Sequence, residues 1–246
     1  MGLMNLSLEE DFLLIFFKSV KLAPNACFVD IGVNVGQTLI KFRSCRNNPY
    51  YGFEPNPACV YYIKALIDTN KIPDATIVPV GLSSSNGVAK FYMKSNVDTA
   101  GTIVNELRPG FYSQEDVQHV PVFSFDSLDV INNPIGLIKI DVEGAELDVL
   151  TGMGEAIKKH KPAILCEILD SHSDENIPGM QAKADKLVAF ITSLDYRILR
   201  IVHENGKITP EEISEVKLKK WTPQSWNLND YLLIPKHVAY TDIVQA

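Results

Sequence analysis

Short apolar segments alternate with helix-forming segments through most of this chain, and that order constrains its fold more than any other feature. Continuous apolar runs are typical of strands buried in a parallel sheet, because helices cover both faces of such a sheet. The predicted helices span residues 57–69, 145–160 and 181–194. The predicted strands span residues 26–31, 50–53, 76–80, 88–93, 119–125, 135–140, 162–168, 196–202 and 231–234. We therefore expect an α/β fold, a mainly parallel sheet with helices on both faces.

The N-terminal segment, residues 1–25, is expected to form a helix that packs on this core. Ser7 and Glu10 have the spacing of a capping box, and Pro24 ends the segment. The residues that this helix is expected to bury are Phe12, Ile15, Phe16 and Leu22. Residues 26–246 are then expected to form a single domain, since a chain of this length builds one sizeable core.

Charge and hydropathy exclude several partners. The net charge of −7 argues against a nucleic-acid partner, because nucleic-acid binding relies on Lys and Arg that neutralise phosphates. The apolar run at 12–17 is too short to span a membrane, and the acidic residues before it do not fit a signal peptide. We therefore expect a cytoplasmic protein without a membrane span. The cysteines lack Cys-x-x-Cys spacing, so free thiols are the favoured interpretation.

The loop after the first predicted strand carries the first candidate site. Asp30 is followed by Gly32 and Gly36, and a helix begins directly afterwards. Glycines let the backbone approach a ligand, and the helix N-terminus offers free N–H groups. A dinucleotide fingerprint requires glycine where this chain has Asn34 and Gln37, and an Asp at position 30 suits a ligand with an ammonium group. Tight strand-to-helix packing is the alternative explanation.

A second carboxylate follows the next predicted strand. Glu54 lies 22 residues after Gly32, since 54 − 32 = 22, and this is the spacing of the acidic residue that binds ribose hydroxyls in nucleotide-binding folds. Asn56 is expected to cap the following helix, which has Pro57 in its first turn. A surface carboxylate in a loop is the alternative for Glu54.

The segment 137–147 holds three ionisable residues, Lys139, Asp141 and Glu143, that alternate with apolar residues. The strand period of two predicts that Lys139 and Asp141 point to one side. A lysine in an apolar strand needs a partner, so the alternative to a functional site is a structural Lys–Asp pair.

Glu167 ends the next predicted strand, and His172 follows on a loop. Beside Asp141 they would form an acid–base pair or a divalent metal site, although His172 on a solvated loop is the favoured alternative.

Six motifs together resemble one known family. They lie at 29–36 (VDIGVNVG), 53–57 (FEPNP), 80–83 (VGLS), 125–128 (FDSL), 138–146 (IKIDVEGAE) and 164–168 (ILCEI). Over residues 26–170 the chain resembles the FkbM family of S-adenosylmethionine-dependent methyltransferases. The string KIDVEGAE is the most specific of these motifs, and Gly81 stands where many members carry Ala.

This resemblance implies a class I methyltransferase fold, a Rossmann-like sheet of seven strands with the last strand antiparallel. It also implies O-methylation of a hydroxyl on a small molecule or a glycan, such as a sugar or a polyketide-type product. Residues matching the family motifs would hold the cofactor: the methionine part by Asp30, Gly32, Asn34 and Gly36, the ribose by Glu54 with Asn56 beside it, the adenine by Leu82 and Ser83, and the transferring methyl by Asp141.

The methylated alcohol must lose a proton, so a base is expected. Asp141 is the first choice for the catalytic base, oriented by Lys139 or assisted by Glu143, and Glu167 with His172 is the second choice. No motif specific for a metal supports a metal cofactor. The segments 94–118 and 211–227 are expected to form the acceptor pocket. Two alternatives stay open: an NAD(P)-dependent oxidoreductase and a non-catalytic protein that binds a nucleoside cofactor.

Overall fold

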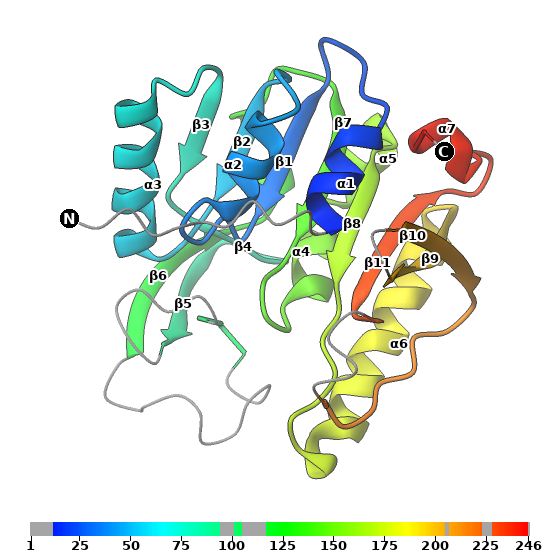
Figure 1. The fold of residues 1–246 in the computed structure, drawn as a ribbon. Helices are drawn as coiled ribbons and strands as arrows, with labels where there is room; N and C mark the ends of the chain where they lie inside the picture. Colours follow the sequence, from blue (N-terminus) through cyan, green and yellow to red (C-terminus); the bar gives the residue numbers. More distant parts are fainter. Residues whose placement is uncertain (1–11, 94–100, 105–116, 205–206, 223–227, 246) are drawn as a thin grey trace.

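A central sheet organises the protein. The computed structural model describes residues 12–93, 101–104, 117–204, 207–222 and 228–245. Its main sheet has eight strands in the order β10-β9-β11-β8-β7-β1-β2-β3 (Figure 1). Their bounds are β1 (Cys27–Ile31), β2 (Tyr50–Phe53), β3 (Ala75–Val78), β7 (Ile135–Ile140), β8 (Ala163–Glu167), β9 (Tyr196–Glu204), β10 (Lys207–Ile213) and β11 (Asp230–Pro235). The strand order reverses between β1 and β7, which is where ligands bind in such sheets.

The predicted parallel core and antiparallel last strand are confirmed, but the predicted count of seven strands is wrong. Strands β1, β2, β3, β7 and β8 pair in parallel, and β11 is antiparallel to both β8 and β9. The eighth strand, β10, forms an antiparallel hairpin with β9. Its sequence contains Pro210 and two adjacent glutamates, residues with a low preference for strands, so the sequence pattern does not predict this strand. Pairing with β9 stabilises it.

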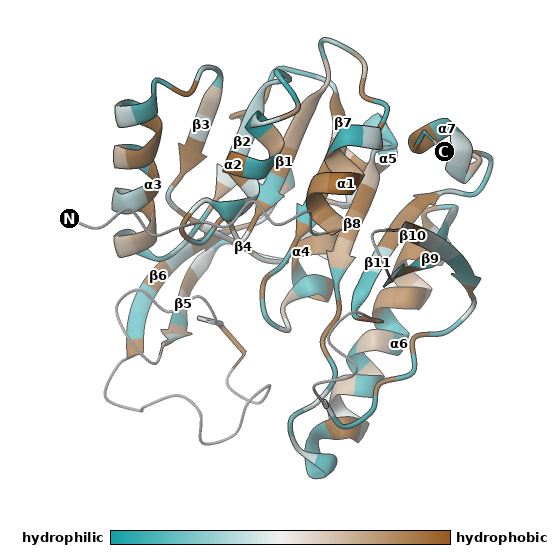
Figure 2. Cartoon of the chain, viewed as in Figure 1, coloured by the Kyte–Doolittle hydropathy of each residue, from teal (hydrophilic) through white to brown (hydrophobic). Residues whose placement is uncertain are grey.

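Helices cover both faces of this sheet, as predicted. One face packs against α1 (Phe12–Ser19), α2 (Gln37–Arg43) and α3 (Pro57–Asn70), and the other against α4 (Glu146–Gly152), α5 (Gly154–His160) and α6 (Ile177–Ser193). Alternate residues of one strand belong to opposite cores: Phe28 packs with α1 and α2, and Val29 packs with the α4–α6 layer. Figure 2 shows the middle strands as mostly hydrophobic, as their burial on both faces requires. No helix in the described ranges is long and apolar enough to cross a membrane.

Two predicted helices differ from the observed ones. The N-terminal helix ends at Ser19, before Leu22, because Val20 pairs with Val244 near the C-terminus. Its buried residues are Leu14, Phe16 and Phe17, whereas Phe12 and Ile15 are only partly buried. The predicted capping residues Ser7 and Glu10 lie outside the described residues.

The helix predicted over 145–160 is interrupted at Met153 and forms α4 and α5. At Gly152, just before the break, an added Cβ would lie 2.0 Å from the backbone oxygen of Ser83. This close approach joins α4 to a second, three-stranded sheet of order β4-β6-β5. Its strands are β4 (Gly81–Leu82), β5 (Gly87–Tyr92) and β6 (Val117–Phe123). A short helix, α7 (Tyr240–Ile243), follows the last strand of the main sheet.

Candidate active site

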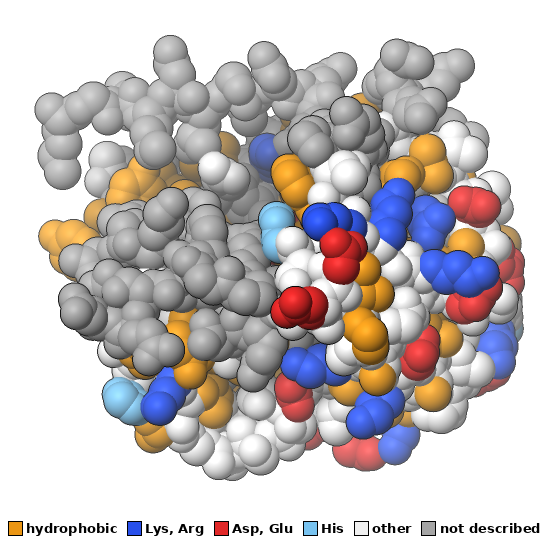
Figure 3. Space-filling model, turned by 90° about the horizontal axis from the view of Figure 1, so that it is seen from below, with side chains coloured by type: hydrophobic (Ala, Val, Ile, Leu, Met, Phe, Trp, Pro, Cys, Tyr) orange, Lys and Arg blue, Asp and Glu red, His pale blue; other side chains and the backbone are white. Residues whose placement is uncertain are grey.

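The carboxyl ends of the parallel strands meet at the lower edge of the sheet in Figure 1, next to the three-stranded sheet. Figure 3 views this edge directly. On its described part, basic and acidic side chains are interspersed rather than gathered into one positive area. Most predicted site residues lie at or just after the carboxyl ends of β1, β2, β7 and β8, so the fold brings them to this edge.

A tight turn at Gly32 joins β1 to its neighbours. Gly32 has φ 85°, and an added Cβ would lie 1.9 Å from the backbone oxygen of Asp141. Its N–H donates to Phe53 O at 3.0 Å, and the N–H of Asp141 donates to Ile31 O at 3.0 Å. Only glycine fits this conformation and this contact, so the position holds three loops together around one crevice.

Glu54 is fixed by the backbone on both sides. Its Oε2 accepts a hydrogen bond from the N–H of Asn34 at 2.8 Å, and its Oε1 accepts one from the N–H of Asn56 at 2.8 Å. Each oxygen keeps a further lone pair that a ligand hydroxyl can use. Burial raises the pKa of Glu54 to about 7, although both backbone hydrogen bonds oppose this rise.

Asp30 lies fully buried at the end of β1. Its Oδ2 accepts a hydrogen bond from the Tyr50 hydroxyl, and its Oδ1 has no hydrogen-bond partner within the described part of the chain. Burial raises the pKa of Asp30 to about 6, while Lys139, its neighbour in register on β7, lowers it. A buried oxygen without a partner costs free energy unless a ligand supplies the donor.

Lys139 and Asp141 form the pair that their spacing predicts. Lys139 Nζ lies 2.8 Å from Asp141 Oδ2, and the lysine side chain is 9% exposed against 34% for the aspartate. Burial opposes the charged form of Lys139, but the carboxylates of Asp141 and Asp30 raise its pKa above the ordinary lysine value. The more exposed Asp141 therefore stands between a buried cation and the crevice.

The turn after Asp141 has a strained backbone and is held by hydrogen bonds to neighbouring side chains. Glu143 and Gly144 both have positive φ, 54° and 98°. The N–H of Gly144 donates to the Glu146 side chain at 2.8 Å, and the hydroxyl of Thr102 donates to the backbone oxygen of Glu143 at 2.6 Å. Burial raises the pKa of Glu146 to about 7.

Further ionisable groups continue from Asp141 across the sheet. Glu167 and Asp230 are register partners on β8 and β11, and Asp230 Oδ2 lies 3.6 Å from His203 Nε2 on β9. The ring of Phe12 on α1 stacks on His203 with a centroid distance of 4.6 Å. Burial, and then Asp141 through its charge and a side-chain hydrogen bond, raises the pKa of Glu167 well above the ordinary glutamate value.

One pocket collects half of the predicted site residues. A cavity of about 80 Å³ at this edge is lined by residues of both sheets. The predicted residues among its lining are Gly32, Asn34, Glu54, Leu82, Asp141 and Glu143. The others lie behind or beside it: Asp30 and Lys139 are buried in the sheet, Glu167 is half-buried at the end of β8, Gly36 is the N-cap of α2, and Ser83 donates its N–H to Phe123 O.

Asn56 caps the helix that follows it, as its sequence predicts. Its side-chain oxygen accepts the N–H of Ala58 at 3.0 Å, which caps α3 as the Asn-Pro sequence predicts. Its amide nitrogen donates to Met93 Sδ at 3.4 Å. The structure thus places Asn56 beside Glu54 as a buried cap, outside the cavity lining.

The contribution of the three-stranded sheet to the pocket could not be predicted from the sequence. Phe91 on β5, Val122 on β6 and residues 101–103 line the pocket together with Asp141. Thr102 pairs with Tyr92 through two backbone hydrogen bonds of 2.8 and 3.0 Å. Alternating apolar residues at 88–93 signal a strand, but nothing in that pattern says which site the strand covers.

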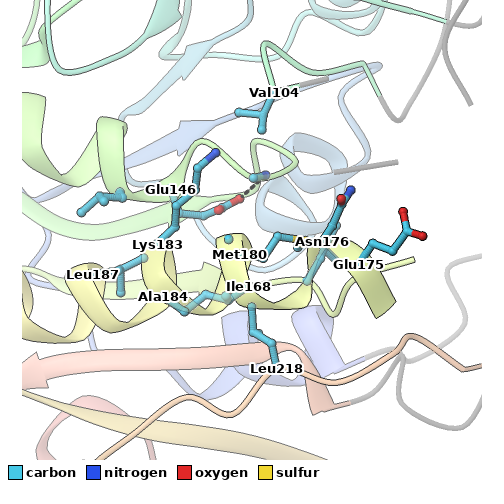
Figure 4. Close-up of a pocket in the computed structure, with 14 residues that line it drawn as sticks. Val104, Glu146, Ile168, Glu175, Asn176, Met180, Lys183, Ala184, Leu187 and Leu218 are labelled. Atoms are coloured by element: carbon cyan, nitrogen blue, oxygen red, sulfur yellow. Dashed lines mark hydrogen bonds between the residues drawn. The ribbon is translucent and has the colours of Figure 1, made fainter. Parts of the chain in front are cut away.

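Figure 4 shows a second cavity, of about 350 Å³. Gly144 lines it, and the chain neighbours Glu143 and Ala145 line the first cavity. The lining of the second cavity is mainly apolar and comes from α4, α6 and the end of β8, including Leu147, Ile168 and Met180. Glu146 and Lys183 provide charge in this lining, and Lys183 lowers the pKa that burial raises at Glu146.

The two segments expected to form the acceptor pocket are described only in part. Val104 and Leu218 line the second cavity, one from each segment. Arg108, Phe111, Tyr112 and Trp226 lie outside the described residues, and 211–213 belong to β10. His119 is exposed on β6.

His172 stacks on Trp221 at 5.1 Å between ring centroids. Across the described chain, no group of three or more His, Cys, Asp and Glu is arranged to hold a metal ion, so a metal site at Glu167 and His172 gains no support.

Comparison with known structures gives the same fold. The methyltransferase FkbM from Methylobacillus flagellatus aligns with a TM-score of 0.53 at 18% identity, covering 87% of this chain and 44% of that one. This chain therefore spans less than half the length of that protein. A SAM-dependent methyltransferase from Aquifex aeolicus aligns with a TM-score of 0.45 at 12% identity, covering 92% of this chain and 89% of that one. A search of curated proteins finds no match.

Comparison with protein families adds the decisive match. Residues 30–198 match the methyltransferase FkbM domain, which is more than half of the chain. The matched range begins at Asp30 and includes the Gly32 turn, Glu54, the Lys139–Asp141 pair and Glu167. The chain belongs to the FkbM methyltransferase family.

Proposed function

We propose that this protein is an S-adenosylmethionine-dependent O-methyltransferase that acts on a hydroxyl of a small molecule or glycan. The observation that carries the proposal is the crevice at the switch point between β1 and β7. There Gly32 brings backbone close to Asp141, and Glu54 offers two fixed carboxylate oxygens. Family membership supports methyl transfer as the class of reaction.

The residues present fit this cofactor. The buried Oδ1 of Asp30 lacks a donor in the described structure, which suits a ligand that carries an ammonium group. Glu54 keeps lone pairs for the two ribose hydroxyls, and Leu82 offers an apolar contact for the base. When bound, S-adenosylmethionine supplies a methyl group on a positively charged sulfur.

The chain's own residues then orient the acceptor and take its proton. Asp141 is the proposed base because it lines the cofactor pocket and is held by Lys139 at 2.8 Å. Lys139 positions this carboxylate, and the main-chain turn at Glu143 borders the same pocket. Glu167 lies behind Asp141 and is the proposed second member of the proton-handling group.

We propose the cavity of about 350 Å³ beside Gly144 as the acceptor pocket. It adjoins the end of β7, so an acceptor bound there reaches the Asp141 turn. Its mainly apolar lining favours an acceptor with an apolar body next to the hydroxyl. Glu146 and Lys183 are the polar groups that would orient such a molecule.

Thermal unfolding tests the cofactor first. The midpoint is measured with S-adenosylhomocysteine, S-adenosylmethionine, NAD and NADP, each in large excess. A ligand at about 100 times its dissociation constant stabilises by about 2.7 kcal/mol, which raises the midpoint by roughly 5–11 °C for a chain of this size. We expect a rise with the two adenosyl ligands alone.

A rise with NAD or NADP alone contradicts the proposal and supports the oxidoreductase alternative. If the adenosyl ligands bind, formation of S-adenosylhomocysteine is followed with a panel of sugar and apolar alcohols. Binding without turnover over a broad panel would favour the non-catalytic alternative.

A further inference from the structure

A continuous row of ionisable side chains crosses the sheet behind the cofactor pocket. This ionisable row consists of Asp30 (β1), Lys139 (β7), Asp141 (after β7), Glu167 (β8), Asp230 (β11) and His203 (β9). Its strand members lie on the face that packs against α1 and α2, because their neighbours in each strand, such as Val29 and Ile138, face the other core. The proposed function uses the row from Asp30 to Glu167 and assigns no role to Asp230 or His203.

The members of the row are neighbours in space. Asp30 and Lys139 are register partners, and Lys139 binds Asp141 at 2.8 Å. Glu167 follows Cys166, the register partner of Ile140, so it lies beside Asp141 on the neighbouring strand. Glu167 and Asp230 stand opposite each other on adjacent antiparallel strands, where paired side chains are close neighbours. Asp230 continues to His203 at 3.6 Å, and Phe12 covers that histidine.

The row holds more acidic than basic groups. Four carboxyl groups face one lysine and one histidine. Asp30 and Lys139 are buried, and the remaining strand members are half-buried. The groups that face Glu167 are Asp141 and Lys139 from β7 and Asp230 from β11, with His203 beyond Asp230. Like charges at neighbouring positions disfavour one another, so a carboxyl group among several others keeps its proton more readily than an isolated one. The row is therefore suited to hold a proton next to the pocket.

We propose that the row holds one proton, shared by Glu167 with Asp141 and Asp230, which leaves when S-adenosylmethionine binds and is replaced by the acceptor's proton during methyl transfer. The inference rests on the proposed function. A positive charge in a pocket lined by Asp141 disfavours a proton on neighbouring carboxyl groups. The methyl donor thus prepares the base, and S-adenosylhomocysteine, which lacks the positive sulfur, does not.

The chemical step balances. The acceptor's O–H bond breaks and its proton goes to the carboxylate of Asp141, which shares it with the row, while the new O–CH3 bond forms. The S–CH3 bond breaks, and its electron pair stays on sulfur, which becomes neutral. The row regains its proton as the positive charge disappears, so the net charge of the site is the same before and after the transfer.

Isothermal titration calorimetry in buffers of different ionisation enthalpy tests this coupling, because it counts the protons released on binding. At pH 6.5 the amino groups of both ligands are protonated. We expect S-adenosylmethionine to release about half a proton to one proton more than S-adenosylhomocysteine, since about one shared proton is available. Sinefungin, which carries an amine in place of the methyl sulfonium, should behave like S-adenosylmethionine.

The linkage has a definite sign. Because binding of the charged ligand releases a proton, its affinity relative to S-adenosylhomocysteine should rise with pH, by up to about tenfold per pH unit. Glu167→Gln should abolish the difference in proton release while S-adenosylhomocysteine still binds. Asp230→Asn should reduce it. The matched control is Glu212→Gln, an exposed partner of Arg197 on the neighbouring strand pair, and it should leave the difference unchanged.

Equal proton release by the charged and neutral ligands in the wild-type protein overturns this inference and leaves the proposed cofactor standing. Binding of neither ligand contradicts the proposed cofactor, and the inference falls with it. If Glu167→Gln fails to fold, the wild-type comparison and Asp230→Asn still decide the matter.

Discussion

The two halves of the crevice hold their carboxylates in opposite ways. At β1 and β2, protein donors engage the carboxylates: two backbone N–H groups bind Glu54, and the Tyr50 hydroxyl binds Asp30. At β7 and β8, Asp141 and Glu167 lie at neighbouring positions, and Asp141 binds the buried Lys139. The first arrangement fixes acceptors for a ligand's donors, and the second makes proton affinity depend on nearby charge. One edge of the sheet thus separates ligand binding from proton transfer.

The largest effect is expected in the β7–β8 half. Asp141→Asn removes the proposed base, so kcat should fall by about 10²–10⁴-fold, the usual range for general base catalysis. Initial rates of S-adenosylhomocysteine formation give kcat, and its thermal shift shows that the cofactor still binds. Turnover near the wild-type rate would falsify the assignment. Asp129→Asn, at an exposed position, is the control and should be neutral.

The β1–β2 half is expected to be most sensitive to a change in backbone geometry at Gly32. Gly32→Ala places a Cβ 1.9 Å from the backbone oxygen of Asp141 at a positive φ. We expect the free energy of unfolding to fall by about 3 kcal/mol, with loss of the ligand-induced thermal shift. Denaturant unfolding measures the first quantity. Gly87→Ala, where an added Cβ meets nothing within 4 Å, should change stability little; equal losses in both variants would contradict the proposed role of the turn.

A milder change in the same half tests ligand binding alone. Glu54→Gln keeps an acceptor for one backbone N–H but loses the charge that holds the ribose hydroxyls. Affinity for S-adenosylhomocysteine should fall by about 10- to 100-fold, as for hydrogen bonds to a charged group. Calorimetric titration gives the dissociation constant. In contrast to Asp141→Asn, kcat at saturating cofactor should stay within a few fold of wild type. A large fall in kcat would contradict the proposed separation of ligand binding from proton transfer.

The smallest effect concerns Glu146, which lines the larger cavity. Burial raises its pKa from 4.5 to about 7, so the folded protein holds this proton more tightly than the unfolded chain. Its contribution to stability is therefore full below about pH 4.5 and is lost as pH rises through 7. Glu146→Gln should flatten the stability profile between pH 5 and 8 by on the order of 2 kcal/mol.

Thermal and denaturant unfolding across that pH range measure the flattening. Glu155→Gln on α5, whose carboxylate is exposed, is the matched control and should keep the wild-type profile. An unchanged profile in Glu146→Gln would mean that this carboxyl group titrates normally in the folded protein.

The sequence alone predicts those parts of the site whose position follows from the order of strands along the chain. Asp30, Glu54 and Asp141 each follow an apolar run, and parallel strands end at one edge, so their meeting is predictable. The proximity of Asp230 to Glu167 is not predictable from the sequence. It depends on the register of an antiparallel pairing between two segments that are distant in the sequence. The same reason hides Thr102, which reaches Glu143 only because a second sheet lies beside the first.

Strand β10 also determines where the main sheet ends. An edge strand exposes unpaired N–H and C=O groups, which invite another chain to add itself. Here Pro210 removes one donor from that edge, and the exposed side chains of Glu211 and Glu212 add negative charge beside it. The extra hairpin therefore protects against aggregation: it covers β9 with a strand that is itself a poor template for further pairing.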